Sequence, residues 1–566
     1  MSILPGPFNP LDPNTQAFPT LSEAQAKRVQ QEGKIRKVKA GEILFEPGDT
    51  NVPFYLLLSG GLEIIQPASL SGEQVIVTYT SAQFTGELTM ISGQRCLARG
   101  RVSEAGEFVE ISNSGLRSLI ARDAELSEIL MRAFILRRLM LISRGLGNLI
   151  LMGSRHSANT LRLREFLSRN GYPYTFIDLD SDVTSQDLLD RFHIQASEIP
   201  VVICGQDRVL RNPTTQELAD CLGLNESIDS SQIRDVIIVG AGPSGLAAAV
   251  YAASEGLDAL MIETEAPGGQ AGSSSKIENY LGFPTGVSGM ELASRAITQA
   301  QKFGAKMMIG HAGVKLICSK RPYRLVLDNG SSIAARAVII STGAQYNKPR
   351  IANLEKFEGL GIYYGATYIE AQLCGNEEAI VVGGGNSAGQ AAVYLSQTAR
   401  KVYMLVRSEN LSETMSRYLI QRIAENPSIE LHYKTEITAL EGDTQLKRVT
   451  WRDAKTGETS THDIGHLFIM AGASPRTAWL ERCLALDNKG FILTGRDLET
   501  SPSPSESPGL ESFHWPLARR PLMLETSLPC VFAVGDARAG NVKRVASAVG
   551  EGAIAVHLVH RALAET

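Results

Sequence analysis

The chain is poor in cysteine and has no cysteine pair at the spacing of a redox or metal motif. Its 566 residues include seven cysteines, and no two of them are spaced as CxxC. This argues against a zinc site and a disulfide framework, and predicts the reduced thiols of a cytoplasmic protein. The first fourteen residues, MSILPGPFNPLDPN, carry no basic residue and are interrupted by prolines. We therefore expect no signal peptide.

The chain also lacks a large net charge and an uninterrupted apolar run. Its formal net charge is -5, so it offers no excess of basic residues to bind nucleic acid or an acidic membrane surface. The most apolar helical stretch, residues 128–152, contains four arginines, so no membrane span is expected. A hydrophobic content of 43% is ordinary for a soluble globular protein. At this length three or four domains of ~150 residues each are expected.

The most informative stretch is Asp235 to Gly245, DVIIVGAGPSG. Its apolar run predicts a buried parallel strand, and a glycine turn separates that run from the helical LAAAVYAASEG. This order lets the backbone approach a pyrophosphate at a helix N-terminus. The next strand ends in Glu263, whose carboxylate can accept a hydrogen bond from a ribose hydroxyl. The pattern predicts a dinucleotide site formed by Gly240, Gly242, Pro243, Ser244, Gly245 and Glu263.

Residues 37–110 alternate short apolar strands with glycine turns, which predicts a small closed β structure. Apolar residues at spacings of three and four over residues 114–143 predict one long or two short helices packed on it. The motifs AGEILFEPGD and FYLLLSGGLEI resemble the cyclic-nucleotide-binding domain family. The resemblance implies a cyclic-nucleotide site formed by Gly86, Glu87 and Arg95. The hydroxyl residues expected after the arginine are absent, so a structural or dimerising module remains the alternative.

Residues 146–226 follow a β-α-β-α-β-β order that resembles a thioredoxin or glutaredoxin domain, with Ile199–Pro200 at the place of the family's cis-proline. A helix is expected at residues 185–194. The family's CxxC is replaced by Ser157-Ala158-Asn159-Thr160, which cannot cycle between dithiol and disulfide. Cys204 and Cys221 are interpreted as small buried hydrophobic residues, with a substitute redox pair as the alternative.

From Asp235 onward the chain resembles low-molecular-weight thioredoxin reductase. The motifs that carry the resemblance are PGGQ, IENYLGFP, the STGA that ends a strand, and the late FAVGD followed by RVASA. They extend the nucleotide site to a full FAD site. Beyond the glycine turn and Glu263, the resemblance implies that FAD contacts Gly269, Gln270, Asn279, Thr342, Gly343, Gly535, Asp536, Val545 and Ala546.

A second strand, glycine turn and helix lie between residues 378 and 466, at AIVVGGGNSAGQ. The strand that follows ends in Arg407, where the first unit has Glu263. A basic residue at this place favours the 2′-phosphate of NADPH over NADH, with Arg417 as a possible second contact. The expected pyridine-nucleotide residues are Gly383, Gly385, Asn386, Ser387, Ala388, Arg407 and Arg417.

The family's redox sequence Cys-Ala-Thr-Cys reads Gly365-Ala366-Thr367-Tyr368 here. Neither Gly365 nor Tyr368 can supply a sulfur to a flavin. Cys374 is interpreted as a packing residue, with an unusual single-thiol redox role as the alternative. Because both places for a dithiol lack sulfur, we expect an electron acceptor different from that of the family.

The predicted architecture is multidomain. It has a cyclic-nucleotide-binding-like β-barrel with its helices (residues 20–145), a thioredoxin-like α/β domain (146–226), and two Rossmann-like α/β nucleotide-binding domains. These are a discontinuous FAD domain (233–347 and 473–566) and an NAD(P)H domain (348–472). The insertion 501–521, rich in proline and serine, is expected to be a disordered or exposed loop.

The predicted function is that of a cytoplasmic, homodimeric FAD-dependent oxidoreductase that passes hydride from NADPH or NADH to FAD and on to an unknown protein or small-molecule acceptor. No metal is expected. The alternatives are a ferredoxin or flavodoxin NADP reductase, a thioredoxin reductase that uses a non-standard thiol, and a flavin-based redox or ligand sensor.

Overall fold

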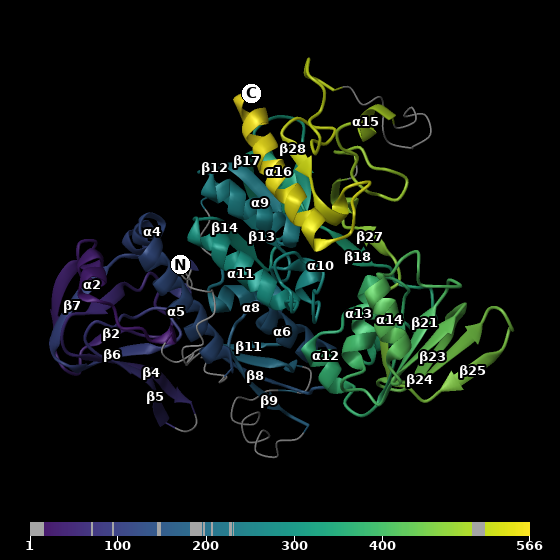
Figure 1. The fold of residues 1–566 in the computed structure, drawn as a ribbon, viewed down its shortest axis with the longest axis horizontal. Helices are drawn as coiled ribbons and strands as arrows, with labels where there is room; N and C mark the ends of the chain where they lie inside the picture. Colours follow the sequence, from purple (N-terminus) through teal and green to yellow (C-terminus); the bar gives the residue numbers. More distant parts are fainter. Residues whose placement is uncertain are drawn as a thin grey trace, which may run out of the picture. The chain divides into compact units, whose positions relative to one another are not determined.

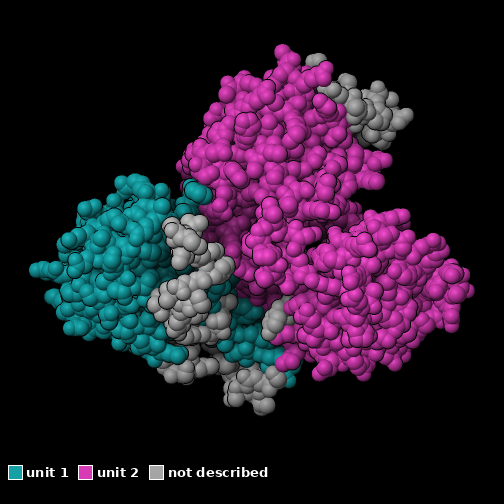
Figure 2. All heavy atoms as spheres, viewed as in Figure 1, with its two compact units in different colours: residues 1–154, 170–227, 301–304 teal, residues 155–169, 228–300, 305–566 magenta. Residues whose placement is uncertain are grey.

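The computed structural model describes residues 16–565 apart from 70–71, 93–94, 144–148, 181–194, 196–197, 205–207, 226–228, 230, 481 and 501–514. The chain divides into two compact units, shown in different colours in Figure 2. The first contains residues 1–154, 170–227 and 301–304, and the second contains 155–169, 228–300 and 305–566.

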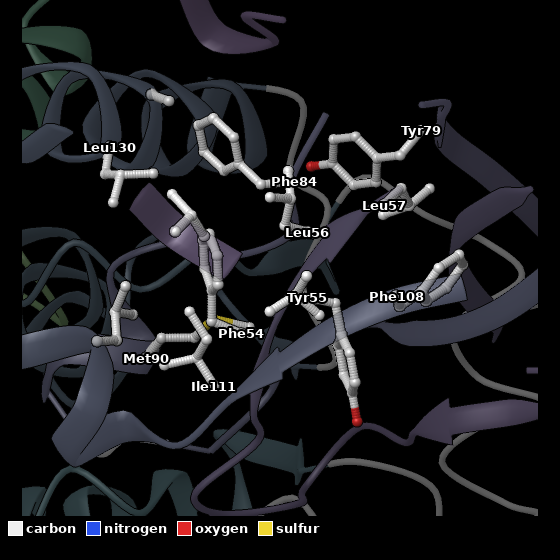
Figure 3. Packing of buried hydrophobic residues seen from close by; sticks show 14 of the residues in the cluster. Phe54, Tyr55, Leu56, Leu57, Tyr79, Phe84, Met90, Phe108, Ile111 and Leu130 are labelled. Atoms are coloured by element: carbon white, nitrogen blue, oxygen red, sulfur yellow. The ribbon is translucent and has the colours of Figure 1, made fainter. Parts of the chain in front are cut away.

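The first unit begins with two antiparallel sheets. One has the order β1-β7-β3 and the other β2-β6-β4-β5. They enclose an aromatic core in which Phe54 stacks on Phe84 with ring centroids 5.7 Å apart (Figure 3). This confirms the expected series of short strands. The strands are β1 (Lys34–Val38), β2 (Ile43–Phe45), β3 (Phe54–Leu57), β4 (Gly61–Ser69), β5 (Gly72–Tyr79), β6 (Arg99–Glu104) and β7 (Gly106–Ile111).

Two helices, rather than one long one, follow the sheets: α4 (Asn113–Arg122) and α5 (Ala124–Ser143). Asp123 separates them, because its backbone is extended and its carboxylate accepts a hydrogen bond from the Leu126 amide (3.0 Å). Leu130 and Phe134 of α5 pack into the aromatic core. The shorter helices α2 (Glu23–Gln30) and α3 (Thr89–Ser92) belong to the same unit.

A four-stranded sheet of order β11-β10-β8-β9 completes the first unit. Strands β8 (Leu149–Gly153) and β9 (Thr175–Asp178) are parallel, while β10 (Val201–Cys204) and β11 (Arg208–Arg211) form a hairpin followed by α8 (Thr215–Leu222). The Ile199–Pro200 peptide bond is cis. The helix expected at residues 185–194 lies outside the described residues, and the thioredoxin-like assignment stays a prediction. Helix α6 (Ala158–Arg169) groups with the second unit.

In the second unit, a seven-stranded sheet has the order β14-β13-β12-β17-β16-β15, with β28 paired to β17 (Figure 1). β28 comes from the far end of the chain and lies parallel to β17, so two separate segments build one sheet. α9 (Pro243–Ser254) and α16 (Val545–Ala564) pack side by side. The strands are β12 (Ile233–Val239), β13 (Ala259–Glu263), β14 (Lys306–Ile309), β15 (Gly313–Ile317), β16 (Tyr323–Leu327), β17 (Ser332–Ile340) and β28 (Val531–Ala533).

The intervening segment forms a five-stranded parallel sheet of order β19-β26-β20-β21-β22 and a three-stranded antiparallel sheet. The parallel strands are β19 (Ile362–Tyr363), β26 (His466–Ile469), β20 (Glu378–Val382), β21 (Lys401–Val406) and β22 (Ile429–Tyr433). The antiparallel strands are β23 (Thr435–Gly442), β24 (Leu446–Asp453) and β25 (Thr459–His462). The helices are α12 (Tyr368–Leu373), α13 (Asn386–Leu395) and α14 (Arg417–Glu425).

Where the chain leaves and re-enters the seven-stranded part, β18 (Ala344–Tyr346) pairs antiparallel with β27 (Ala473–Pro475). The remaining helices in the described part of the unit are α10 (Gly269–Gly272), α11 (Gly289–Lys302), α15 (Asp497–Thr500) and the short 3₁₀ turns η2 (Glu355–Phe357), η3 (Ala478–Leu480) and η5 (Gly535–Ala537). Residues 501–514 of the proline-rich insertion lie outside the described residues. Past them, Trp515 donates its indole N–H to the Arg519 carbonyl (2.5 Å).

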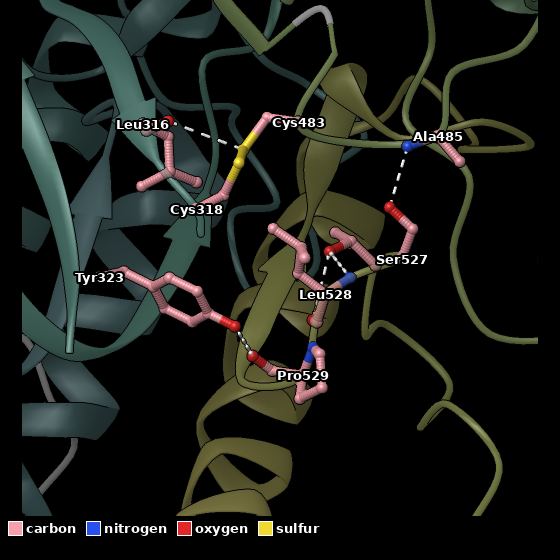
Figure 4. Close-up of a disulfide and its surroundings, with 9 residues drawn as sticks. Leu316, Cys318, Tyr323, Cys483, Ala485, Ser527, Leu528 and Pro529 are labelled. Atoms are coloured by element: carbon pink, nitrogen blue, oxygen red, sulfur yellow. Dashed lines mark hydrogen bonds between the residues drawn. A yellow bond between two sulfur atoms is a disulfide. The ribbon is translucent and has the colours of Figure 1, made fainter. Parts of the chain in front are cut away.

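The expectation that the cysteines are unpaired is wrong for four of the seven. Cys204 is bonded to Cys221 in the first unit, and Cys318 to Cys483 in the second (Figure 4). The partners are 17 and 165 residues apart in sequence, so no local spacing indicates them, and only the fold brings their Cα atoms to 6.6 and 6.2 Å. Cys96, Cys374 and Cys530 take part in no disulfide bond.

Within the described part of the chain, no helix is both long and apolar enough to cross a membrane, and no group of three or more potential metal ligands occurs.

Candidate active site

A cavity of about 1670 Å³ in the second unit is lined by residues from both nucleotide-binding segments. Most of the residues expected to contact FAD lie on its wall, together with part of the second glycine turn. From the expected FAD set these are Gly240, Gly242, Pro243, Ser244, Glu263, Gly269, Gln270, Asn279, Thr342, Gly343, Asp536 and Val545; from the expected pyridine-nucleotide set they are Gly385, Asn386 and Ser387. The cavity therefore joins the two expected sites.

The first glycine turn is formed as its sequence requires. Gly240 follows β12 with φ +104°, and its amide donates to the Ile262 carbonyl (2.8 Å). Gly245 permits close packing of helix on turn, because an added Cβ would lie 1.9 Å from the Gly240 carbonyl oxygen. Gly242 is the N-cap of α9 and makes no side-chain capping bond. The amides of the first helical turn are thus left for an anion such as a pyrophosphate.

Glu263 ends β13 beside this turn and is only 9% exposed. Its Oε2 accepts a hydrogen bond from the Ala241 amide (2.7 Å), and its Oε1 accepts one from the Glu265 amide (3.0 Å). These two bonds fix the carboxylate at the cavity wall. Oε1 also accepts a hydrogen bond from the Thr264 hydroxyl (3.3 Å). Oε2 therefore keeps the lone pair with which a ribose hydroxyl can bond.

The rest of the expected FAD site is built from several loops. Gly269 has φ +54° and an added Cβ would lie 3.0 Å from the Gly242 Cα, so this loop lies against the turn. The Gln270 Nε2 donates to the Ala344 carbonyl (2.6 Å), which fixes the side chain in place and leaves its oxygen as an acceptor. Burial raises the pKa of Asp536. α16 begins at Val545, also without a side-chain cap.

Three residues of the expected FAD set lie behind the wall rather than on it: Gly245, Gly535 and Ala546. Gly535 has φ +66° and packs against Ser244, where an added Cβ would lie 2.5 Å from the Ser244 Oγ. Ala546 belongs to the first turn of α16. These positions shape the backbone around the cavity instead of lining it.

The second glycine turn lies between β20 and α13. Gly385 caps α13 without a side-chain bond, and Gly383 has φ +144° with an added Cβ 2.6 Å from the Met470 carbonyl oxygen. Ala388 is fully buried behind the turn. Tyr346 hydrogen-bonds to Ser387, and burial raises the Tyr346 pKa. This hydrogen bond links the connecting strand β18 to the helix start.

The two arginines of the expected pyridine-nucleotide set do not line the cavity. Arg407 follows β21 and Arg417 begins α14, and both residues are exposed. The Asn386 Oδ1 accepts a hydrogen bond from the Ser416 amide (2.8 Å), which ties the start of α14 to the glycine turn. Both guanidinium groups therefore lie on elements that flank the turn.

Gly365, Ala366 and Thr367, at the place of the family's redox cysteines, line the same cavity. An added Cβ at Gly365 would lie 3.9 Å from the Ser273 Oγ. Thr367 caps α12, and its amide donates to the Glu370 Oε2 (2.8 Å). The position that holds a redox cysteine in the resembled family thus faces the cavity, but here it has no sulfur atom.

Cys374 is fully buried at the end of α12 and does not line the cavity. Its thiol donates to the Glu370 carbonyl (3.2 Å), and burial raises its pKa to about 12. A thiol in this state is protonated at neutral pH and is a poor nucleophile. The structure favours the packing role over a redox role.

Sequence reasoning missed the contribution of α6 to the cavity, because no motif marks it. Five residues of this helix lie on the wall: Ala158, Leu161, Arg162, Glu165 and Arg169. Arg169 donates to the Gly269 carbonyl (3.0 Å), beside the expected FAD site. Glu165 hydrogen-bonds to Glu370, and burial, followed by that carboxyl group, raises the Glu165 pKa to about 9. The only available signal was the apolar periodicity of residues 158–169, which predicts a helix but not its neighbours.

Comparison with known proteins agrees with this geometry. A family model described as pyridine nucleotide-disulphide oxidoreductase matches residues 234–505, and one described as cyclic nucleotide-binding domain matches residues 35–123. The thioredoxin reductase of Treponema pallidum is 32% identical over 323 residues, which are 57% of this chain and 95% of the relative. That of Bacillus subtilis is 31% identical over 339 residues, 60% of this chain and 97% of the relative.

Two solved structures are similar to more than half of the chain. Lactococcus lactis thioredoxin reductase in its FR conformation has a TM-score of 0.51 and 25% identity, and covers 59% of this chain and 100% of its own. The T. acidophilum thioredoxin reductase has a TM-score of 0.50 and 27% identity over 58% of this chain and 98% of its own. Proteins of this family use FAD and NADPH, and the residues around the cavity fit both. The chain therefore belongs to the pyridine nucleotide-disulphide oxidoreductase family as a thioredoxin reductase-like, FAD-dependent oxidoreductase with a cyclic nucleotide-binding domain ahead of it.

Proposed function

We propose that this oxidoreductase reduces a small-molecule electron acceptor inside the cavity, without a thiol relay. The observation that carries the proposal is the turn Gly365-Ala366-Thr367-Tyr368, whose first three residues line the cavity and which holds no sulfur. When bound, FAD accepts hydride from a pyridine nucleotide and passes two electrons on. Flavin-to-disulfide transfer requires a sulfur that neither Gly365 nor Tyr368 has, and Cys374 is buried behind them.

Two separate glycine turns of the chain would hold the two nucleotides. The uncapped start of α9 would bind the FAD pyrophosphate, Glu263 its ribose, and Gln270 with Asn279 the polar edge of its ring. The uncapped start of α13 would bind the pyridine-nucleotide pyrophosphate, and Arg407 with Arg417 the 2′-phosphate of NADPH.

Helix α6 supports a small acceptor over a protein dithiol. Leu161 is 6% exposed and joins the apolar cluster that contains Tyr363 and Ala366. Ala158 packs against Gly359, where an added Cβ would lie 2.8 Å from the Ala158 Cβ. The chain's own helix therefore covers the neighbourhood of Gly365, where an external protein would have to bring its disulfide. A small molecule needs only the cavity.

The proposal is tested with purified protein loaded with FAD and an anaerobic panel of acceptors. The panel contains quinones, ferricyanide, ferredoxin, flavodoxin, and oxidised thioredoxin, with NADPH and NADH compared as donors. We expect turnover with at least one small acceptor and none with thioredoxin, in the wild type and in Cys374→Ser alike. Turnover with thioredoxin that disappears in Cys374→Ser would establish the non-standard thiol instead. Turnover with ferredoxin or flavodoxin alone would establish a ferredoxin or flavodoxin reductase.

A further inference from the structure

Two buried polar atoms at the cassette Gly86-Glu87 of the first unit, one on Glu87 and one on the neighbouring Arg137, have no hydrogen-bond partner among the described residues. Arg137 of α5 is 5% exposed; its Nη1 donates to the Gly86 carbonyl (2.8 Å) and its Nε to the Ala17 carbonyl (2.7 Å). Arg138 of α5 pairs with the Glu87 carboxylate (3.5 Å). Among the described residues, neither the Arg137 Nη2 nor the Glu87 Oε1 has a hydrogen-bond partner. A buried donor and a buried acceptor without hydrogen bonds favour a ligand that carries both an oxyanion and a hydroxyl group.

Arg95, which the cyclic-nucleotide resemblance assigns to a phosphate, is engaged elsewhere in the same unit. Its Nη1 donates to the carbonyl oxygen of Cys221 (3.3 Å). It also lies against Gly223, which ends α8 with φ +64°; a Cβ added there would lie 2.7 Å from the Arg95 Nε. The last carbonyls of a helix carry partial negative charge, so they attract a guanidinium group. Arg95 thus sits on the C-terminus of α8.

Helix α8 is itself tethered by a disulfide. Cys221, in its last turn, is bonded to Cys204 at the end of β10. Cys221 is 4% exposed, whereas Cys204 is only partly buried, so an external thiolate reaches the Cys204 sulfur first. An eight-residue helix is marginal without tertiary restraint. Loss of the tether therefore loosens the carbonyl on which Arg95 rests.

We propose that the Cys204–Cys221 disulfide is a second redox site of this chain, reduced by an external dithiol, and that its reduction frees Arg95 to bind the phosphate of a cyclic nucleotide. The inference goes beyond the proposed oxidoreductase function and rests on the cyclic nucleotide-binding family match over residues 35–123.

The reaction is an ordinary thiol–disulfide exchange. A thiolate of the dithiol attacks the Cys204 sulfur, the Cys204–Cys221 bond breaks, and Cys221 leaves as a thiolate that takes up a proton. The second thiol of the reductant then resolves the mixed disulfide and releases Cys204. The chain gains two electrons and two protons, and the dithiol becomes a disulfide. By linkage, the nucleotide in turn favours the reduced form.

The test measures the binding of a fluorescent 3′,5′-cyclic AMP analogue to the full chain by anisotropy, before and after dithiothreitol. Alkylation and mass mapping report the state of each cysteine. We expect affinity for the analogue to rise on reduction by roughly 5- to 150-fold, the usual range of coupling between sites. The double variant Cys204→Ser/Cys221→Ser should bind tightly with or without reductant.

The second disulfide supplies the matched control. Cys318→Ser/Cys483→Ser retains the Cys204–Cys221 pair and should keep the full response to dithiothreitol. Arg95→Gln should lose the gain in affinity on reduction while its Cys204–Cys221 bond still opens on the mass map. Equal affinity in the two redox states, no binding in either state, or free Cys204 and Cys221 in air-oxidised protein would each overturn the proposal. None of these results depends on turnover with an acceptor, so they leave the proposed oxidoreductase function standing.

Discussion

Glu165 of α6 and Glu370 of α12 form a hydrogen-bonded carboxyl pair on the wall of the cavity. Glu370 is 2% exposed and also accepts a hydrogen bond from the Thr367 amide. Two carboxylates that meet in a buried place cannot both be ionised without strong repulsion, so one of them holds a proton. Since the Glu165 pKa is raised to about 9, Glu165 holds it at neutral pH. The hydrogen bond made by this proton connects α6 to α12, the helix that begins at the turn containing Gly365.

The first prediction concerns the pH dependence of stability. Glu165 binds its proton in the folded chain up to about pH 9, whereas the unfolded chain releases it near pH 4.5. The stabilising contribution is full below the lower value and is lost as pH rises between the two, by at most about 1.4 kcal/mol per pH unit. Glu165→Gln keeps the hydrogen bond without titrating, so we expect its free energy of unfolding not to fall in this way. Its Tm relative to wild type should increase from pH 5.5 to pH 8.5.

The control for this measurement is Glu458→Gln, which replaces an exposed carboxylate on a loop of the same unit. Its Tm should follow that of wild type at every pH. Parallel curves for wild type and Glu165→Gln would show that Glu165 is ionised in the folded chain.

The second prediction concerns Glu263 and the retention of FAD. A hydrogen bond from a neutral hydroxyl to a carboxylate contributes about 1.5 to 3 kcal/mol. Glu263→Gln should therefore weaken FAD binding by roughly 10- to 150-fold, measured as the flavin fluorescence released on dilution. Glu291→Gln, on the exposed face of α11, should leave the FAD dissociation constant unchanged. Full FAD retention in Glu263→Gln would remove Glu263 from the site.

The third prediction concerns Arg407 and the choice of nicotinamide donor. If its guanidinium binds the 2′-phosphate, Arg407→Ala should raise the KM for NADPH by roughly tenfold or more and leave the KM for NADH within about twofold. Arg417→Ala should act in the same direction. The control is Arg400→Ala. Arg400 is another exposed arginine, directly before β21, and it pairs with Glu378. Equal effects on both donors would show that Arg407 is only a surface charge.

The fourth prediction concerns Cys374. Because its thiol is buried and its pKa is raised to about 12, replacing it should disturb packing and not chemistry. Cys374→Ser is expected to keep kcat with any small acceptor within about twofold, while the buried hydroxyl lowers the free energy of unfolding by about 1 to 3 kcal/mol. A loss of kcat larger than tenfold, with FAD content unchanged, would restore the single-thiol mechanism.

The sequence was sufficient for those parts of the site that depend on local backbone geometry. A turn or a close helix contact requires glycine at positions 240, 245 and 383. Such requirements can be recognised in a short sequence motif. The order of strands around Glu263 and Arg407 likewise follows from parallel β-α-β units. The family membership and the cyclic nucleotide-binding region were also predictable from motifs.

What the sequence could not provide were contacts between distant segments. Cys318 and Cys483 are 165 residues apart, and nothing local distinguishes them from Cys374 or Cys530. Glu165 was read as part of a thioredoxin-like helix, yet its raised pKa depends on Glu370, two hundred positions later. Arg95 was read as a phosphate contact, and its bond to Cys221 depends on α8, more than one hundred positions later in the chain. The homodimer and the cytoplasmic location stay predictions.

The most direct measurement is an anaerobic titration of the FAD-loaded protein with NADPH. The flavin absorbance spectrum and the number of free thiols are recorded at each step. A chain without a thiol relay takes up two electrons per FAD. The flavin should be fully reduced by one equivalent of NADPH, with no new thiols on the mass map. Consumption of two equivalents together with the appearance of a reduced cysteine pair would contradict the account.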